Sequence, residues 1–454
     1  MNKNDPQVTN GWAMYDWANS VYPLVITSTI FPIYFDSQAN VAAVAHDGSG
    51  RSIVAFFGMP ILASSLLIYA VSFAFLIVAA VSPLLTALAD YSGRKKRFMQ
   101  YFCYLGALSC GGLFCFTAAN LSMAVLLYIL ATVGFAGSIV FYNSYLPDIA
   151  TEDRVDALSA KGFSFGYIGS AILLVLCLGL VLGAPALGMD AGLASRVSFL
   201  LTGVWWGGFA LIPFTRLPRD RGRTAHSVTA AGKSHLFNGY RQLARIWAEL
   251  RKLPVLKRFL LSYFFSCMGV QTVMYVATLF AGEELGMEQQ ALITTILILQ
   301  VVGVAGAQLF AKLSEAVGNI RALSMAVVVW SGICGAGYFV QAGWSFYVLA
   351  ACIGFAMGGV QSLSRSTYAK LIPEDTPDSA SWFSFFDVTE KLAIVIGTAS
   401  FGFISQVTGT MRNSLLTLIV FFALGLGFLL TLWGKVLRLR PAAPPMPAVL
   451  SGER

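Results

Sequence analysis

The stretch LTALADYSGRKKRF, Leu85 to Phe98, lies between two long apolar runs and decides the fold. Asp90 stands near the end of the first run, and Gly93, which has no Cβ, can turn the chain at positive φ. Arg94 and Lys95 follow and can pair with carboxylates or with carbonyl groups at helix C-termini. A cytoplasmic loop that requires only basic residues would not require Asp90 or Gly93. We therefore expect a gating loop formed by Asp90, Gly93, Arg94 and Lys95.

The composition is that of an integral membrane protein. Of 454 residues, 57% are hydrophobic and 11% are charged, whereas soluble domains carry about 25% charged residues. The net charge of +8 fits basic cytoplasmic loops better than nucleic-acid binding. Because the sequence contains no Walker loop, no GxSxG motif and no Cys or His pair with zinc-site spacing, we expect no metal, no cofactor and no enzymatic activity.

Twelve apolar runs are long enough to span a bilayer, which requires about 20 apolar residues each. The predicted spans are 12–36, 56–88, 98–119, 121–146, 160–183, 196–215, 257–281, 291–313, 322–341, 345–371, 382–407 and 413–437. The second is longer than needed, so it is either strongly tilted or begins along the outer surface around Pro60. Trp12, Trp17, Trp330 and Trp344 stand near span ends and predict interfacial belts.

Basic residues predict that both termini are cytoplasmic, because Lys and Arg are retained on that side. With the N-terminus inside, four of the 30 basic residues fall elsewhere: Arg51, Arg196 and Arg412 in outer loops, and Lys391 within the eleventh span. We expect a multi-pass protein of the bacterial inner (cell) membrane.

A hydrophilic linker divides the chain. The expected parts are an N-terminal six-helix half at 1–215, the basic linker at 216–256, a C-terminal six-helix half at 257–437 and a cytoplasmic tail at 438–454. In the second part of the linker apolar residues recur at three- and four-residue steps: Leu236, Tyr240, Leu243, Trp247 and Leu250. This pattern predicts an amphipathic helix, either on the membrane surface or solvated between the halves.

Two tripeptides recur at one offset and indicate homologous halves. Gly134-Phe135-Ala136 returns as Gly354-Phe355-Ala356, and Phe163-Ser164-Phe165 returns as Phe383-Ser384-Phe385. Each pair falls at matching helix positions. Six helices per half give the halves one orientation, as in transporters whose substrate path runs between parallel halves.

The loop from Leu85 to Phe98 closely resembles the signature loop of the major facilitator superfamily, Gly-x-x-x-Asp-x-x-Gly followed by two basic residues. Ala87 stands roughly where the first glycine is expected. In the second half, KLSEAVGN places Glu315 and Gly318 in register with Asp90 and Gly93, without the basic pair. The resemblance implies an all-α membrane fold of twelve transmembrane helices in two pseudo-symmetric six-helix halves.

A narrower resemblance lies in the first span, GWAMYDWANSVYPLVITSTIFPIYF, Gly11 to Phe35, and in Gln361-Ser362-Leu363-Ser364-Arg365-Ser366. Both stretches are similar to the "unknown major facilitator" family, which includes vacuolar amino-acid effluxers of fungi. The resemblance runs through most of the chain and implies an efflux-type secondary transporter. The fungal substrate need not carry over to this protein.

Five ionisable residues fall inside predicted spans, where such groups cost at least about 2.5–3.5 kcal/mol each and mark pathways or proton relays. They are Asp16, Arg365, Asp387, Glu390 and Lys391. The last three share one side of a helix at i, i+3, i+4, and the aligned positions 166–170 of the first half carry no charge.

Arg365 lies at a compatible depth to pair with Glu390 or Asp387. Three carboxylates against two cations leave one carboxylate that is either protonated or neutralised by a bound cation. We nominate Glu390 as the coupling group, or Asp387 if Glu390 pairs with Arg365. The alternative is a structural ion-pair network that clamps the second half, and Asp16 could equally anchor the first helix.

Uncharged polar side chains inside the spans complete the candidate substrate and coupling residues. They are Asn19, Asn143, Gln271, Tyr275, Gln300 and Gln361. The alternative for each is a helix-to-helix hydrogen bond.

These residues predict a secondary active transporter that moves a small polar or amphipathic solute, such as an amino acid, by alternating access with proton coupling. The expected partners are a small-molecule substrate, a coupling proton and the lipid bilayer, without nucleic acid, and we expect a monomer. Arg365 and Lys391 would suit a carboxylate, and Glu390 would accept an ammonium group. The alternatives are a transporter of lysophospholipid-like lipids with the same fold, and a non-transporting membrane sensor or scaffold.

Overall fold

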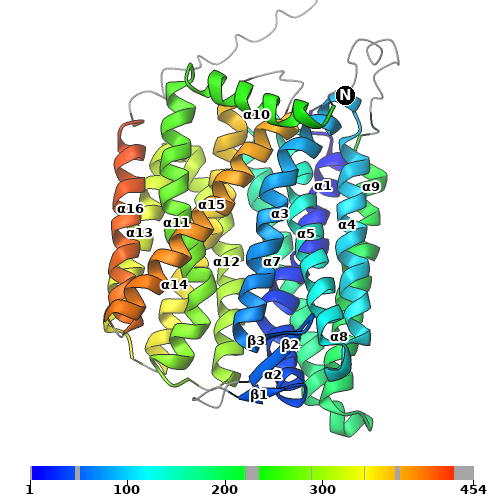
Figure 1. Ribbon diagram of the computed structural model, residues 1–454. Coiled ribbons are helices and arrows are strands. Elements are labelled where there is room, and N and C mark those ends of the chain that lie inside the picture. The colour runs from blue at the N-terminus through cyan, green and yellow to red at the C-terminus, as the bar shows by residue number, and fades with distance from the viewer. Residues whose placement is uncertain are drawn as a thin grey trace, which may run out of the picture.

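The protein is a bundle of long helices that run roughly parallel from one end to the other (Figure 1). The computed structural model describes residues 3–46, 52–218, 220, 235–287, 289–341, 343–373, 379–408 and 410–433. The N-terminus and α10 (His235–Leu250) lie at one end of the bundle, which we call the α10 end (Figure 1). The expected tail at 438–454 and linker residues 221–234 lie outside the described residues.

Eleven helices in the described part of the chain are long and apolar enough to cross a membrane. Their main elements are α3 (Ala63–Ser92), α4 (Lys95–Gly112), α5 (Leu121–Ser144), α7 (Val155–Leu182), α8 (Ala191–Phe209), α11 (Pro254–Glu283), α12 (Gln289–Val317), α13 (Asn319–Phe339), α14 (Trp344–Leu371), α15 (Ser379–Thr408) and α16 (Met411–Leu430). Short helices join them: η2 (Leu113–Cys115), η3 (Ala118–Asn120), α6 (Leu146–Ile149), η4 (Ala184–Leu187) and α9 (Leu211–Arg216).

The first predicted span forms in three parts: α1 (Pro6–Asn19), the π-helix η1 (Tyr22–Ile30) and α2 (Phe31–Val41). Pro23 opens η1 and Pro32 opens α2, and neither has an N–H for a regular α-helical bond. In the widened turns, the Ser28 hydroxyl donates to the Pro23 carbonyl at 2.9 Å. With this composite helix, the bundle is consistent with the twelve predicted spans.

The second span begins later than predicted. Residues 56–62 were expected to be helical, but they belong to a hairpin of β2 (Ser52–Phe56) and β3 (Met59–Leu62). β1 (Ala45–His46) pairs with β2, so the sheet order is β1-β2-β3, with Phe56 opposite Met59. Pro60 has no N–H to donate and fits this edge strand. Helix α3 then starts at Ala63.

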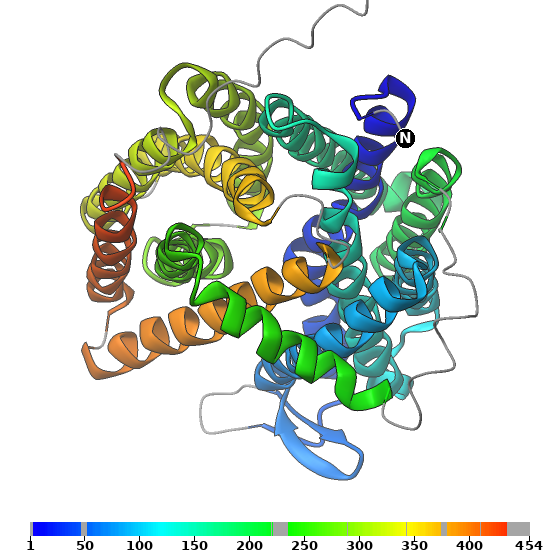
Figure 2. The ribbon, with the colours of Figure 1, turned by 90° about the horizontal axis from the view of Figure 1, so that it is seen from above.

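Packing between helices joins the part of the bundle before the linker, the first half, to the part after it, the second half. Helix α3 packs on α15, and α7 packs on both α12 and α14. Seen from the α10 end, the two groups of helices lie side by side (Figure 2). Within the second half α12 and α14 approach closely, because a Cβ on Gly354 would overlap the Leu299 carbonyl. Small residues permit such contacts between membrane helices.

Helix α10 lies across the ends of α3 and α15 (Figure 2). Its residues Ile246 and Leu250 are buried, and its Trp247 ring lies 5.9 Å from the Phe385 ring. The predicted helix is therefore present. Two expected belt residues are not interfacial, since Trp12 and Trp330 are fully buried, whereas Trp344 is exposed.

Candidate functional site

A buried ion pair joins the two halves. Asp16 on α1 accepts from Arg365 on α14, with 3.2 Å between Oδ2 and Nη1, and the two side chains are 8% and 5% exposed. The Tyr142 hydroxyl donates to the same carboxylate oxygen at 2.8 Å. Arg365 also donates to the Ser159 hydroxyl at 3.0 Å and to the Ser159 carbonyl at 2.8 Å. Both charges are thus hydrogen-bonded, as buried ions require.

Aromatic rings enclose the Arg365 guanidinium. Its central carbon lies 4.1 Å from the Phe163 ring centre, 4.9 Å from Trp12 and 5.5 Å from Tyr142. Gly162 makes room for the pair, because a Cβ there would overlap the Asp16 carboxylate and lie 3.0 Å from Arg365 Nη2. A cation among aromatic faces is stabilised most when water is excluded, so this geometry favours a firm contact between the halves.

The expected pairing of Arg365 with Glu390 or Asp387 is wrong. Depth along α14 is compatible with those residues, but the Arg365 side chain turns toward α1 and α7. Asn143, another predicted residue, accepts from Arg365 Nη1 at 3.3 Å. Two predicted residues, Asp16 and Asn143, therefore share one partner.

The charges of α15 form a separate group with α11, which we call the α15 cluster: Asp387, Glu390, Lys391 and Gln271. Lys391 Nζ lies 3.2 Å from Asp387 Oδ1 and 3.9 Å from Glu390 Oε2. Gln271 Nε2 donates to Glu390 Oε1 at 2.6 Å. The Lys391 ammonium also lies 5.2 Å from the Phe75 ring on α3, so the cluster faces the seam between the halves.

Charge in the α15 cluster does not balance. Arg365 is paired with Asp16, so Lys391 is the cation that serves both Asp387 and Glu390. Asp387 Oδ2 is buried and has no hydrogen-bond partner among the described residues. Side-chain exposure is 6% for Asp387, 11% for Lys391 and 23% for Glu390. Glu390 is therefore both the more accessible carboxylate and the more distant one from the shared cation.

At the offset of 220 residues, Asp387, Glu390 and Lys391 align with Tyr167, Ser170 and Ala171, and two glycines beside these positions have a packing role. A Cβ on Gly166 would overlap the Ser20 hydroxyl, and one on Gly169 would lie 2.9 Å from Trp17. These glycines let α7 approach α1 closely, and a larger side chain at either glycine would not fit.

Two of the remaining predicted polar residues bond to α7. Gln300 donates to the Ser170 hydroxyl at 3.1 Å, and Gln361 accepts from the Tyr167 hydroxyl at 2.8 Å. Both bonds cross between the halves, as the helix-to-helix alternative expects. Tyr275, one turn beyond Gln271 on α11, is 41% exposed, and Asn19 is buried.

The gating loop contacts the start of α15. Gly93 ends α3 with φ +64°, the left-handed turn expected of it. Asp90 accepts from the Ser381 backbone N–H at 2.9 Å and from its hydroxyl at 2.8 Å. Lys95 pairs with Asp148 at 2.9 Å and donates to the Ser379 hydroxyl. The Arg94 side chain is exposed. In the second half, Gly318 also has positive φ, +87°.

Sequence reasoning missed a second buried ion pair between the halves. Asp156 on α7 pairs with Lys370 on α14 at 2.6 Å, and accepts from Ser314 at 3.0 Å and from Asn319 at 2.7 Å. The predicted fifth span began at residue 160, which left Asp156 in a loop. Helix α7 begins at Val155 instead and carries Asp156 inward.

All these polar contacts between the halves lie from the middle of the helices to the α10 end. Among described residues they include Asp16–Arg365, Ser82–Ser384, Asp90–Ser381, Lys95–Ser379, Asp156–Lys370, Ser159–Arg365, Gln308–Ser164, Gln361–Tyr167 and Gln300–Ser170. The halves are therefore held together at the α10 end.

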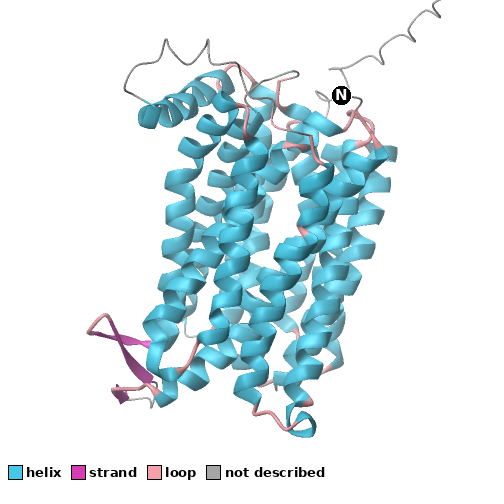
Figure 3. Cartoon of the chain, turned by 90° about the vertical axis from the view of Figure 1, so that its right-hand side faces the viewer, coloured by secondary structure: helices cyan, strands magenta, loops and turns pink. Residues whose placement is uncertain are grey.

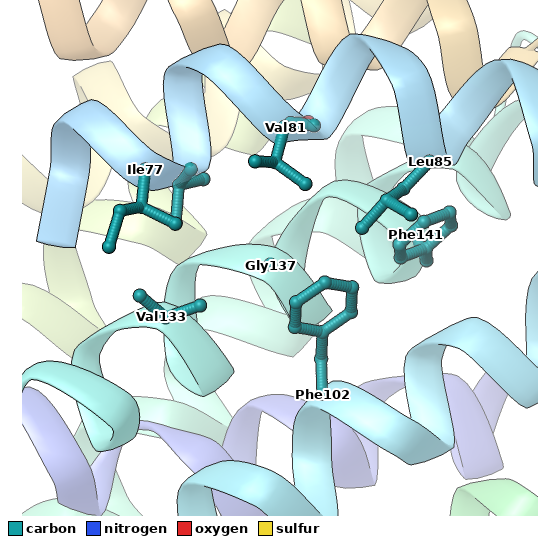
Figure 4. A pocket seen from close by; sticks show the side chains of 9 residues that line it. Ile77, Val81, Leu85, Phe102, Val133, Gly137 and Phe141 are labelled. Atoms are coloured by element: carbon teal, nitrogen blue, oxygen red, sulfur yellow. The ribbon is translucent and has the colours of Figure 1, made fainter. Parts of the chain in front are cut away.

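A small apolar hollow, with a cavity volume of about 20 Å³, lies between α3, α4 and α5 (Figure 4). Ile77, Val81 and Leu85 point into it from α3, with Phe102 from α4 and Phe141 from α5 (Figure 4). Its lining offers no charged group, so it suits a hydrocarbon rather than a polar solute.

Known proteins resemble the chain over almost its whole length. The profile of the family described as "Vacuole effluxer Atg22 like" matches residues 4–436. The chain is 30% identical to the uncharacterized MFS-type transporter YxiO of Bacillus subtilis, over 94% of this chain and 95% of that protein. It is 25% identical to autophagy-related protein 22 of Yarrowia lipolytica, over 83% of this chain and 77% of that protein.

Solved structures share the fold. The major facilitator superfamily transporter FucP, in its outward conformation, matches with TM-score 0.66 and 15% identity, over 94% of this chain and 98% of that one. The human organic anion transporter MFSD10 matches with TM-score 0.69 and 14% identity, over 94% of this chain and all of that one (100%). At such identities the likeness concerns the architecture alone.

Proposed function

Because the chain belongs to the Atg22-like vacuole effluxer family of major facilitator superfamily transporters, we propose that it exports a small polar or amphipathic solute, such as an amino acid, by proton-coupled alternating access. The family and the fold are those of multi-pass membrane transporters and not of enzymes. We further propose that it works as a monomer in the bacterial cell membrane, with both termini cytoplasmic, as the basic loops favour.

The observation that carries the proposal is the unbalanced charge of the α15 cluster. Glu390 lies among membrane-spanning helices, bonded to Gln271 and 3.9 Å from a lysine that is closer to Asp387. A carboxylate without a cation of its own in such a place is stable when it binds a proton or a cationic group. Proton coupling requires one group that alternates between these two occupants.

The same charges support a proposal for how the solute is recognised. Lys391 already serves two carboxylates and Arg365 is held by Asp16, so neither cation is free for the carboxylate of a solute. Glu390 can accept an ammonium group. We propose that the amino group of the solute, rather than its carboxylate, supplies most of the recognition.

The position of the contacts between the halves supports the proposal of alternating access. They gather at the α10 end, including two buried ion pairs. A solute can leave at that end only if these contacts break, so this arrangement corresponds to a state closed at the α10 end. With the proposed orientation, that end is cytoplasmic.

Counterflow in proteoliposomes tests the transport proposal. The panel should compare an amino acid with its methyl ester, which keeps the ammonium group, and with its N-acetyl derivative, which keeps the carboxylate. We expect the free amino acid and the ester to compete for exchange and the N-acetyl compound to fail. Competition by the N-acetyl compound alone would contradict recognition through the amino group. Absence of exchange across a wide amino-acid panel would instead favour the sensor or scaffold.

A second candidate is the transport of lysophospholipid-like molecules, which the apolar hollow between α3, α4 and α5 favours. This function predicts that the protein speeds the movement of a fluorescent lysolipid between leaflets. Substitution of Val81, which points into the hollow, by Phe would fill it and slow that movement. Lysolipid movement at the rate of protein-free vesicles would exclude this candidate.

A further inference from the structure

The hairpin β2–β3 carries an apolar tip outside the helix bundle. Figure 3 shows its strands reaching sideways past the helices, at the end opposite α10. Its base is fixed, because Val54 is buried and the Ser52 hydroxyl donates to Asn40 on α2. The tip is not fixed in this way, since Phe57 is 64% exposed and Met59 is 58% exposed.

The turn at the tip places Phe57 in a backbone conformation that bulky residues rarely adopt. Phe57 and Gly58 both have positive φ, +48° and +82°, between the paired residues Phe56 and Met59. This is the geometry of a type I′ turn, which prefers Asn-Gly because Asn tolerates the left-handed region. A bulky aromatic residue there is an outlier. Backbone preference therefore does not explain why Phe57 stands at this position. A favourable contact between its exposed ring and its surroundings would explain it.

The sequence of the hairpin and the surface next to it indicate the environment of the Phe57 ring. Ser52 to Leu62, SIVAFFGMPIL, contains no charged residue, whereas turns that face water are rich in polar residues. Helix α3 follows β3 directly and continues the apolar surface as an exposed stripe of Tyr69, Phe73 and Leu76. The tip is thus continuous with a surface that belongs in lipid.

The depth of the tip follows from its backbone. An open sheet edge is not stable in the hydrocarbon core, because its N–H and C=O groups would lack partners. β3 is such an edge strand, and it leads into the beginning of α3. The hairpin therefore belongs at the level of the lipid headgroups, where aromatic side chains are enriched.

We propose that the hairpin tip, Phe57, Gly58 and Met59, inserts into the headgroup region of the leaflet at the end of the bundle opposite α10. The partner is lipid and not a second protein chain. In the proposed orientation this is the outer leaflet, but the proposal does not depend on which side of the membrane that end faces. It is also independent of the substrate.

The test places 4-fluorophenylalanine at position 57 of the full chain by nonsense suppression, a change too small to disturb folding. The protein is reconstituted in nanodiscs of phosphatidylcholine and phosphatidylglycerol. Fluorine relaxation is then measured with nitroxide lipids labelled at carbon 5 or carbon 16 of the acyl chain, and with a water-soluble gadolinium chelate.

Two control positions calibrate the reagents. The same label at Phe73, exposed on α3 and about 15 Å beyond its start at 1.5 Å per residue, should respond most to the deep nitroxide. At Phe116, which is fully buried, it should respond weakly to all three. At position 57 we expect the shallow nitroxide to act more strongly than either the deep nitroxide or gadolinium.

Two results would overturn the proposal. Relaxation dominated by gadolinium would place the tip in water. Weak relaxation by all three reagents, as at Phe116, would mean that another protein surface covers it.

Discussion

Asp16 and Arg365 are separated by most of the chain, yet they form a buried ion pair with 3.2 Å between carboxylate and guanidinium. One comes from the first helix of the first half and the other from α14 of the second half. The pair lies in an aromatic enclosure and shares its donors and acceptors with Tyr142, Asn143 and Ser159. We interpret it as a lock that holds the α10 end closed.

Gly162→Ala should strain this lock. The new Cβ would overlap the Asp16 carboxylate, and overpacking of this kind costs about 1–3 kcal/mol. The matched control is Gly179→Ala on the same helix, where a Cβ would meet nothing within 4 Å. We expect thermal unfolding in detergent to show a lower Tm for Gly162→Ala and an unchanged or slightly higher Tm for the control. Equal Tm values for the two variants would show that the pair tolerates displacement.

Removal of one charge of the pair should cost more than removal of both. Asp16→Asn leaves the Arg365 charge buried without its carboxylate, and an uncompensated buried charge costs about 3–5 kcal/mol. Arg365→Met in the same chain removes that charge. We expect the double variant to unfold at a higher temperature than Asp16→Asn alone. A fully additive loss of stability would mean that the two side chains do not act as a pair.

A disulfide across the seam should stop the transport cycle. The Ser82 and Ser384 hydroxyl oxygens lie 3.1 Å apart, on α3 and α15, so cysteines at these positions meet at a distance that a bridge can span. The exposed native cysteines, Cys115 and Cys352, would first be replaced by serine. We expect oxidation to abolish exchange and a reductant to restore it. Full exchange by cross-linked protein would contradict the opening of this seam during transport.

Much of the fold could be predicted from hydropathy and from one loop. The apolar runs placed the spanning helices, and Asp90 and Gly93 predicted the turn after α3, where Gly93 does adopt positive φ. The hairpin at residues 52–62 could not be separated from the start of α3, because a short apolar run fits a strand or a buried helix equally well.

The site was less predictable, because depth along a helix does not reveal which neighbour a side chain faces. The spacing of Asp387 and Lys391 predicted their contact, which lies within a single helix and needs no knowledge of packing. The partner of Arg365 depends on how α14 is rotated against α1 and α7, and the prediction was wrong. Asp156 was missed because the start of α7 was placed a few residues too late.

The most direct test of the account compares wild type and Glu390→Gln in proteoliposomes, with solute exchange at equal pH and net transport driven by a pH gradient. Gln271→Leu is the control, because it removes the bond to Glu390 and leaves the carboxylate in place. We predict that Glu390→Gln loses the acceleration by the gradient and needs a higher solute concentration for exchange at equal pH, because it lacks the carboxylate that accepts the ammonium group. Gln271→Leu should keep the acceleration. Gradient-driven transport by Glu390→Gln at the wild-type rate would contradict the role of Glu390 in proton coupling.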